Sequence, residues 1–400
     1  MRIWSILWLL IYRALYGAEL KRYKIYLKIA AVALAIWTAD CLILTLMDKV
    51  QGTAGFPFFE TVKRFATRWD SNSFARIAEN WYVTEGNDRY LIVFPPLYPA
   101  IVRAVHFITG LDFWISGLAT SMVCSVISGM VLFEILIPGS DEKTSFYQVV
   151  LYYLYPFSFF FFTGMSEGLY LLLILLFVCF FRSGRYISAG LSGFLCALTR
   201  LPGIALIMPA AVFFVIKAVE AAKQKELRKH IYDLAGSAAA ALMTILGFIV
   251  YLLLNYALFG DPMQFIVYEQ ENWGQHMTDI FTSIKTVAGF QLLSADIYGW
   301  GFVAGVAVPN LLAFITGLSL TFWCAVKKKY PEAVYSAVYT YFSLSVSWLL
   351  SGGRYTLGMY PLYMMTEGAV RKRKLMYILM AVFAVLHIAA CMLYISNQIY

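Results

Sequence analysis

The stretch IYDLAGSAAAALMTILGFIVYLLLNYA, residues 231–257, carries a single charged side chain, Asp233. About 20 apolar residues in a helix cross the roughly 30 Å hydrocarbon core of a membrane, because a helix satisfies its own backbone hydrogen bonds there. Apolar runs of comparable length recur along the whole chain, which is 61% hydrophobic and only 14% charged. The alternating pattern of a membrane β-barrel is absent. The sequence therefore predicts an all-α polytopic membrane protein.

We expect about eleven to twelve spans in one integral membrane domain covering residues 1–400. A segment at 92–109, opened by Pro95, Pro96 and Pro99, is expected to be a short or re-entrant helix. The apolar N-terminal run is too short to span, so we expect residues 3–17, within 1–24, to form a helix lying in the interface rather than a signal peptide. The candidate spans are 28–47, 113–136, 146–163, 167–181, 186–200, 203–219, 231–257, 300–325, 332–350, 355–370 and 374–396.

The net charge of +8 arises from lysines and arginines in short loops between apolar runs, such as Lys217 to Lys229. They indicate membrane topology, and no binding of nucleic acid is expected. Placing the basic clusters in the cytoplasm puts several polar segments on the opposite, outer face. These are the first outer loop at 48–91, Ser166-Glu167, Arg200, the second large outer loop at 259–299, and Gly353-Arg354.

The first outer loop contains helical spacing of apolar residues from Phe58 to Trp69, which predicts an amphipathic surface helix. The apolar face changes at Asp70, after which Phe74 and Trp81 share a face. Asp70 is then either the N-cap of a second surface helix or a carboxylate pointing into the protein. A carboxylate held at the membrane boundary, with Trp69 beside it, suits a general base.

Arginines at the outer ends of apolar runs are candidates for binding phosphate. Arg200 and Arg354 each interrupt an apolar stretch where an unpaired cation would be costly, and Arg68 and Arg89 lie in the first outer loop. The alternatives are contacts with lipid headgroups or ion pairs within the protein. Glu167 is expected either to orient a sugar hydroxyl, to pair with Arg200, or to sit in a solvated turn.

The second large outer loop contains Asp261-Pro262, a pair typical of a helix start. The helix that follows carries Phe265, Tyr268, Glu269, Gln270 and Trp273. Aromatic side chains beside amides and acids suit a platform for a sugar, although an interfacial aromatic belt has the same composition.

No metal site is expected, because His106, His230, His276 and His387 lie far apart and form no metal-binding spacing. The six cysteines are scattered in apolar runs without a CxxC pattern, which favours small buried side chains. Phosphate-binding loops of nucleotide enzymes are also absent.

The segment RWDSNSFARIAENWY, residues 68–82, followed by FPPLYP at 94–99, resembles the early outer-loop signature of the PIG-V family. That family adds the second mannose during GPI-anchor synthesis and has bacterial relatives. Asn72 and Ser73 depart from the family pattern, in which a bulky residue and a histidine are expected. Later segments similar to family landmarks are YPFSFFFFTGMSEGLYLLLILL (155–176), TRLPG (199–203), FGDPMQFIVYEQENWG (259–274) and SGGRYTLGMYPLY (351–363).

The resemblance implies a GT-C-type helix bundle and an inverting mannosyltransferase with Asp70 as its catalytic base. Its donor would be a polyprenyl-phosphate mannose or a similar lipid-linked sugar, and its acceptor a lipid-linked or surface glycan. The chain looks more like a bacterial homologue, which implies the cytoplasmic membrane rather than the endoplasmic reticulum, with the active site on the outer face. A partner subunit is possible but nothing names one. The alternative function is a lipid or glycolipid transporter or flippase, because polar residues at helix ends also line translocation routes.

Overall fold

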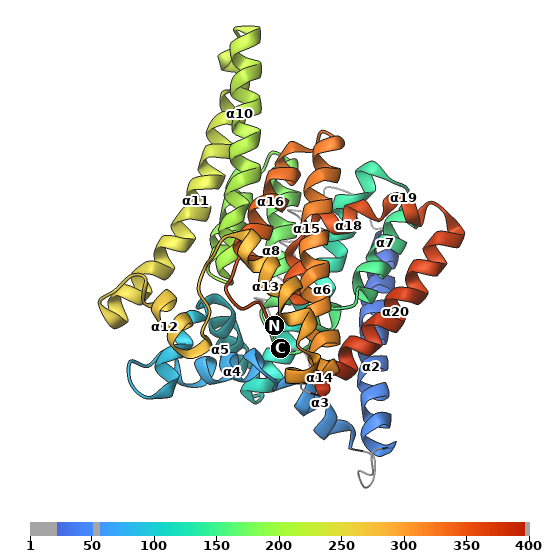
Figure 1. The fold of residues 1–400 in the computed structure, drawn as a ribbon. Helices are drawn as coiled ribbons and strands as arrows, with labels where there is room; N and C mark the ends of the chain where they lie inside the picture. The colour runs from blue at the N-terminus through green and yellow to red at the C-terminus, as the bar shows by residue number, and fades with distance from the viewer. Residues whose placement is uncertain (1–21, 51–56, 397–400) are drawn as a thin grey trace.

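The computed structural model describes residues 22–50 and 57–396, which form helices joined by turns (Figure 1). Within these ranges, extended pairing is limited to one isolated bridge between Met277 and Val346, so the all-α prediction is confirmed. The predicted interfacial helix at 3–17 lies outside the described residues. The principal helices are α2 (Tyr23–Val50), α3 (Phe58–Ala66), α4 (Asp70–Asn80), α5 (Leu97–Thr109), α6 (Phe113–Leu136), α7 (Glu142–Leu154), α8 (Glu167–Arg182), α9 (Tyr186–Ala197), α10 (Ile207–Gln224), α11 (Leu227–Phe259), α12 (Gln264–Trp273), α13 (Ile280–Gly289), α14 (Ala295–Phe302), α15 (Val308–Val326), α16 (Tyr330–Leu344), α17 (Gly352–Tyr355), α18 (Pro361–Met365), α19 (Glu367–Val370) and α20 (Arg373–Ile395).

Six described segments are long and apolar enough to cross a membrane, which makes this a multi-pass membrane protein. The number rises to seven if the bent pair Asn87–Val93 and Leu97–Thr109, which meet at 112°, is one broken span. The expected number of spans is about eleven to twelve, and the other predicted spans lie outside this set of long apolar helices. Several predicted spans form shorter helices, and even the 16 residues of α8 reach only about 24 Å. The six segments are Tyr23–Met47, Phe113–Gly139, Leu201–Gln224, Leu227–Phe259, Ala295–Val326 and Arg373–Ile395.

The predicted span 355–370 is not one helix: it runs from the last residue of α17 through a 3-10 turn at Thr356–Gly358 to the short helices α18 and α19. A break in a helix frees backbone carbonyls that need hydrogen-bond donors. Here α16 supplies them: the hydroxyl of Tyr335 donates to the carbonyl of Gly358 at 2.8 Å, and that of Tyr339 donates to the carbonyl of Tyr355 at 2.9 Å. Tyr335 and Tyr339, which lie in the predicted span 332–350, therefore stabilise the irregular segment at 355–358 through their hydroxyl groups.

The two large loops meet at one end of the molecule. Figure 1 shows the tip of the α10–α11 hairpin at one end, and α3, α4, α5 and α12 at the other. The rings of Tyr90, from the first loop, and Tyr268, from α12, lie 5.0 Å apart. The convergence of these loops on one face is thus confirmed, while the assignment of that face as the outer one stays a prediction.

Close packing of α11 against α9 depends on glycine. A Cβ atom added at Gly247 would collide with the backbone carbonyl oxygen of Phe194. Small residues of this kind let membrane helices approach closely, where dispersion contacts hold them together. The backbone carbonyl cannot rotate away as a side chain could, so this contact fixes the spacing of the two helices.

We expect Gly247→Ala to destabilise the protein by about 1–3 kcal/mol, because the added methyl forces α9 and α11 apart. Thermal unfolding in detergent measures the effect. The control is Gly289→Ala: Gly289 also lies in a helix, but nothing lies within 4 Å of its added Cβ. Equal melting temperatures for the two variants would contradict this account of the helix contact.

Candidate active site

Arg354 is the centre of a buried network of charged side chains. It lies in α17 with only 4% of its side chain exposed, and its Nη1 donates to Asp70 Oδ2 at 2.6 Å. Its Nε donates to Glu167 Oε1, and its guanidinium carbon lies 5.2 Å from the centroid of the Phe160 ring. The guanidinium thus joins α17 to α4 and α8, which are far apart in sequence.

The sequence around Arg354 explains its burial. Gly352 donates its backbone N–H to Asn310 Oδ1 at 2.8 Å, and a Cβ at Gly353 would collide with the ring of Phe157. Two glycines therefore bring the start of α17 close to neighbouring elements. Burial lowers the pKa of Arg354, but the charges of Glu167 and Asp70 outweigh it and raise the pKa above its ordinary value.

Glu167 is the second member of the network and begins α8. Its Oε1 accepts hydrogen bonds from both Arg354 Nε and Arg200 Nη1, and Arg200 Nη1 also donates to Ser166 Oγ at 3.2 Å. The predicted pairing of Glu167 with Arg200 is confirmed, and the solvated-turn alternative is excluded because only 4% of the Glu167 side chain is exposed. The turn before it uses Gly164, at φ 72°, where a side chain would be strained.

Asp70 is the first residue of α4 rather than its cap. The capping position is held by Trp69, at φ 50° and ψ −127°, and no side chain caps the helix. The structure therefore favours the inward-pointing carboxylate over the N-cap alternative. Ser71 fastens this helix start by donating to the carbonyl of Thr163 at 2.6 Å. The change of apolar face in the sequence marks the break between α3 and α4.

A small cavity adjoins the network, and polar atoms without partners face the interior there. Among the described residues, Arg354 Nη2, Glu167 Oε2 and the hydroxyl of Tyr170 are buried without a hydrogen-bond partner. Such atoms are costly unless water or a ligand satisfies them. The cavity is lined by Glu167, Tyr170, Arg200, Tyr339, Arg354, Tyr355, Leu357 and Gly358.

The other predicted arginines make different contacts. Arg68 Nη1 donates to the backbone carbonyl of Tyr394 at 3.0 Å, near the start of α4. Arg89 donates to the carbonyl of Gly86 at 3.0 Å and to the hydroxyl of Tyr90 at 2.6 Å. These contacts do not join Arg89 to Arg354, so its predicted place in a shared phosphate site is not supported.

The residues of the predicted sugar platform on α12 make contacts within the protein, and their role in binding a sugar stays a prediction. The ring of Tyr268 lies 5.4 Å from that of Phe259, the ring of Trp273 lies 6.0 Å from that of Phe94, and Gln270 is exposed. The two aromatic side chains therefore support α12 by contacts within the protein. Neither ring stacks on a residue of the charged network within the described part of the chain.

The helix start predicted at Asp261-Pro262 is wrong by a few residues. Asp261 Oδ1 accepts from the backbone N–H of Met263 at 2.8 Å, which makes a turn, and α12 begins at Gln264. An aspartate that bonds the backbone two residues later forms a turn as readily as a helix cap.

Glu269 is the acidic residue of the predicted platform on α12, and its charge interacts with that of Asp70. Burial, and then the charge of Asp70, raise the pKa of Glu269 from 4.5 to about 7. Its position is visible as a pattern, because Phe265, Glu269 and Trp273 follow helical spacing along one face. An acidic residue within an apolar helix face is the sequence feature that indicates a buried carboxyl group here.

The raised pKa of Glu269 predicts a pH-dependent stability. The folded chain binds the carboxyl proton of Glu269 more tightly than the unfolded chain does. The contribution of this proton to the free energy of unfolding is therefore fully present below pH 4.5 and is lost as pH rises to about 7. We expect Glu269→Gln to flatten that decline, giving a variant that gains stability relative to the parent at pH 8 but not at pH 4.5. Melting temperatures across this range measure it. Glu271→Gln, at an exposed position on the same helix, is the control, and an identical profile for both variants would refute the assignment.

Comparison with known proteins gives a structural match but no sequence match. No family model matches the chain, and no curated protein matches it. The crystal structure of ArnT from Cupriavidus metallidurans bound to undecaprenyl phosphate is similar with a TM-score of 0.53 and 14% identity, over 90% of this chain. The fold is of the GT-C type. The predicted fold class is thereby confirmed.

A second ArnT structure from the same organism, in the apo state, matches with a TM-score of 0.47 and 16% identity, again over 90% of this chain. The chain spans 63% of the length of ArnT. The resemblance to the PIG-V family in particular is tested by none of these matches and stays a prediction.

Proposed function

We propose that this chain is an inverting glycosyltransferase that takes its sugar from a polyprenyl-phosphate donor. The observation that carries the proposal is the buried network of Asp70, Glu167, Arg200 and Arg354, beside a cavity with unsatisfied polar atoms. The GT-C-type fold supports it, since the similar ArnT structure is described as bound to undecaprenyl phosphate. Four charged side chains gathered in an apolar protein mark a functional site in preference to a structural one.

Asp70 is the proposed general base. The oxygen of an acceptor hydroxyl attacks the anomeric carbon of the donor sugar, and the bond from that carbon to the phosphate oxygen breaks with its electron pair left on the phosphate. Asp70 accepts the hydroxyl proton. Arg354 holds Asp70 through Oδ2, which leaves Oδ1 for the acceptor. General base catalysis of this kind typically contributes about 10²–10⁴-fold.

Arg354 and Arg200 are the proposed phosphate ligands. Arg354 Nη2 lacks a protein partner in the described chain, so it is a donor available to an anion. Charge-assisted bonds from guanidinium groups suit phosphate oxygens, and they would neutralise the charge that develops as the phosphate leaves. Glu167 accepts from both arginines and orients them, rather than contacting the sugar.

The finer proposal follows the PIG-V resemblance. It specifies mannose as the sugar, a lipid-linked or surface glycan as the acceptor, and the outer face of a bacterial cytoplasmic membrane as the location. Trp69, which is 36% exposed beside Asp70, and Arg68 are proposed to contact the substrate at the mouth of the site. Tyr268, Gln270 and Trp273 are not part of this proposal.

Mass spectrometry of lipid-linked glycans and surface polymers, from cells with and without this protein, tests the function. We expect one class of glycan to lose a hexose when the protein is absent, and to regain it with the parent chain but not with Asp70→Asn. A lipid-linked glycan that accumulates unchanged in one leaflet, with no covalent difference, would instead support a flippase.

A further inference from the structure

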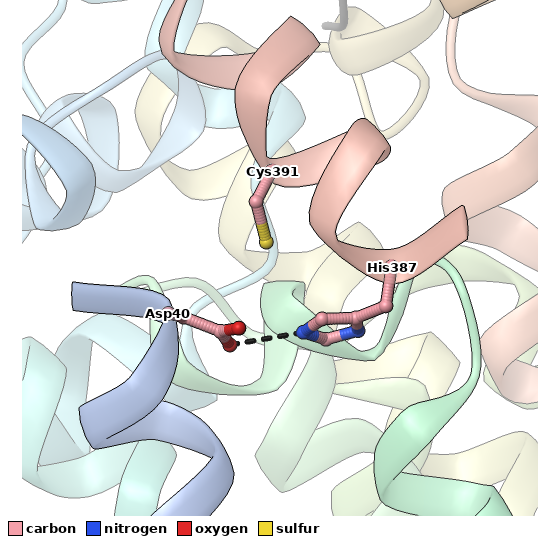
Figure 2. Close-up of side chains that lie close together, drawn as sticks. All are labelled: Asp40, His387 and Cys391. Atoms are coloured by element: carbon pink, nitrogen blue, oxygen red, sulfur yellow. Dashed lines mark hydrogen bonds and ion pairs between the residues drawn. The ribbon is translucent and has the colours of Figure 1, made fainter. Parts of the chain in front are cut away.

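A second polar cluster lies between α2 and α20, away from the charged network. Asp40 from α2 faces His387 and Cys391 from α20, and Figure 2 shows the three side chains directed toward a common space. One ligand atom from each, a carboxylate oxygen, an imidazole nitrogen and the thiol sulfur, all lie within 4.8 Å of one another. Their exposed fractions are 4%, 2% and 2%, so bulk water does not reach them.

The hydrogen bonds of His387 define which of its nitrogens is free. Its Nδ1 lies 3.0 Å from the backbone carbonyl oxygen of Tyr155, which can only accept, and 3.2 Å from Ser158 Oγ, whose own proton is directed at the carbonyls of Tyr153 and Tyr155, so Nδ1 carries a proton. Nε2 lies 2.9 Å from Asp40 Oδ2, so these two atoms share either a proton or a bound metal ion.

The surroundings supply no other cation. Within the described chain, the ion pair of Asp40 is with His387 and none is formed with a lysine or arginine. The thiol of Cys391 likewise forms no hydrogen bond to a described residue. A carboxylate inside a candidate membrane span is costly without a compensating charge, which makes such a residue a functional-site candidate.

We propose that Asp40, His387 and Cys391 bind a zinc ion. A carboxylate oxygen, an imidazole nitrogen and a thiolate sulfur are the three ligand types that zinc takes in proteins. The bond from His387 Nδ1 to a backbone carbonyl is the arrangement by which metal-binding histidines are oriented. Binding releases the Cys391 proton to solvent and leaves a fourth coordination position for a water molecule.

A bound zinc ion would stabilise the segment that carries Arg354, through a chain of hydrogen bonds. Tyr155, whose carbonyl lies against His387 Nδ1, donates its hydroxyl proton to Thr356 Oγ1 at 2.8 Å. Thr356 Oγ1 in turn donates to the carbonyl of Gly353, next to Arg354, at 2.6 Å. Zinc bound between α2 and α20 thus supports the segment that carries Arg354, and it takes no part in the reaction itself.

Metal analysis of the full-length protein, purified in detergent with any affinity tag removed, tests this proposal. We expect about one zinc ion per chain, as purified or after zinc is supplied and excess removed. Cys391→Ser and His387→Gln should each lower bound zinc at least about tenfold. The matched control is Cys324→Ser, since Cys324 is also buried but lies on α15, and it should keep its zinc.

Cobalt substitution of the parent protein gives a result that does not depend on folding of the variants. A thiolate-to-cobalt charge-transfer band should appear in the parent and in Cys324→Ser, because Cys391 supplies a sulfur ligand. Absence of zinc uptake and of the cobalt band in the parent would overturn the proposal and leave a proton-bridged Asp40–His387 pair. Equal zinc in Cys391→Ser and Cys324→Ser would overturn it as well.

Discussion

Replacing Asp70 by asparagine should abolish sugar transfer while leaving the protein folded. The amide keeps the shape of the side chain but cannot accept the hydroxyl proton, so the expected loss is at least about 100-fold in turnover. Asp70 is 29% exposed and sits at the start of α4, where the neutral side chain is tolerated sterically. Arg354 retains its contact with Glu167 in this variant.

The matched control for Asp70→Asn is Asp88→Asn. Asp88 lies in the same loop, pairs with Arg76, and has the same 29% side-chain exposure, but it is not joined to Arg354. Transfer should be unaffected by this change. Both proteins are assayed in liposomes after their melting temperatures are compared. Full transfer by Asp70→Asn, or equal losses in the two variants, would remove Asp70 as the base.

Replacing Arg354 by methionine should have the largest effect on stability. The side chain of Arg354 is 4% exposed and bonds both Asp70 and Glu167, so its removal leaves the buried Glu167 with Arg200 alone and Asp70 without its ion-pair partner. Removing one partner of a buried ion pair typically costs about 3–5 kcal/mol, chiefly because the remaining charge is uncompensated. Transfer should be lost as well.

The control for Arg354→Met is Arg182→Met. Arg182 pairs with Glu332 but is 38% exposed, and an exposed ion pair typically contributes about 0–1 kcal/mol. Denaturant titration in detergent should therefore separate the two variants clearly. A stability change below about 1 kcal/mol for Arg354→Met would show that the network is not the buried, mutually compensating set described here.

The residues of the network could be predicted from the sequence because each interrupts an apolar pattern. Glu167, Arg200 and Arg354 are charges at the ends of apolar runs, and Asp70 sits where an apolar face changes side. Assigning the basic loops to one side of the membrane placed them all on the other side. Their mutual pairing could be named only for Glu167 and Arg200, since contacts across hundreds of residues leave no local pattern.

What the sequence missed has an equally physical explanation. The aromatic residues of α12 satisfy both a sugar platform and core packing, so composition could not separate the two. His387 and Cys391 are spaced four residues apart on α20, yet Asp40 lies 347 positions from His387. Only the packing of α2 against α20 brings them together. Several predicted spans form helices of fewer than 18 residues, and the apolar run near Gly358 and Pro361 is broken although its composition suggests a continuous helix.

Release of polyprenyl phosphate from an isotope-labelled polyprenyl-phosphate mannose is the most direct test of the proposed function. The purified chain in liposomes is incubated with this donor and a lipid extract as acceptor, and the products are followed by mass spectrometry. The parent protein should form a labelled glycan and free polyprenyl phosphate in equal amounts, and Asp70→Asn should form neither. A donor that stays intact with the parent protein, or only changes leaflet, would contradict the assignment as a glycosyltransferase.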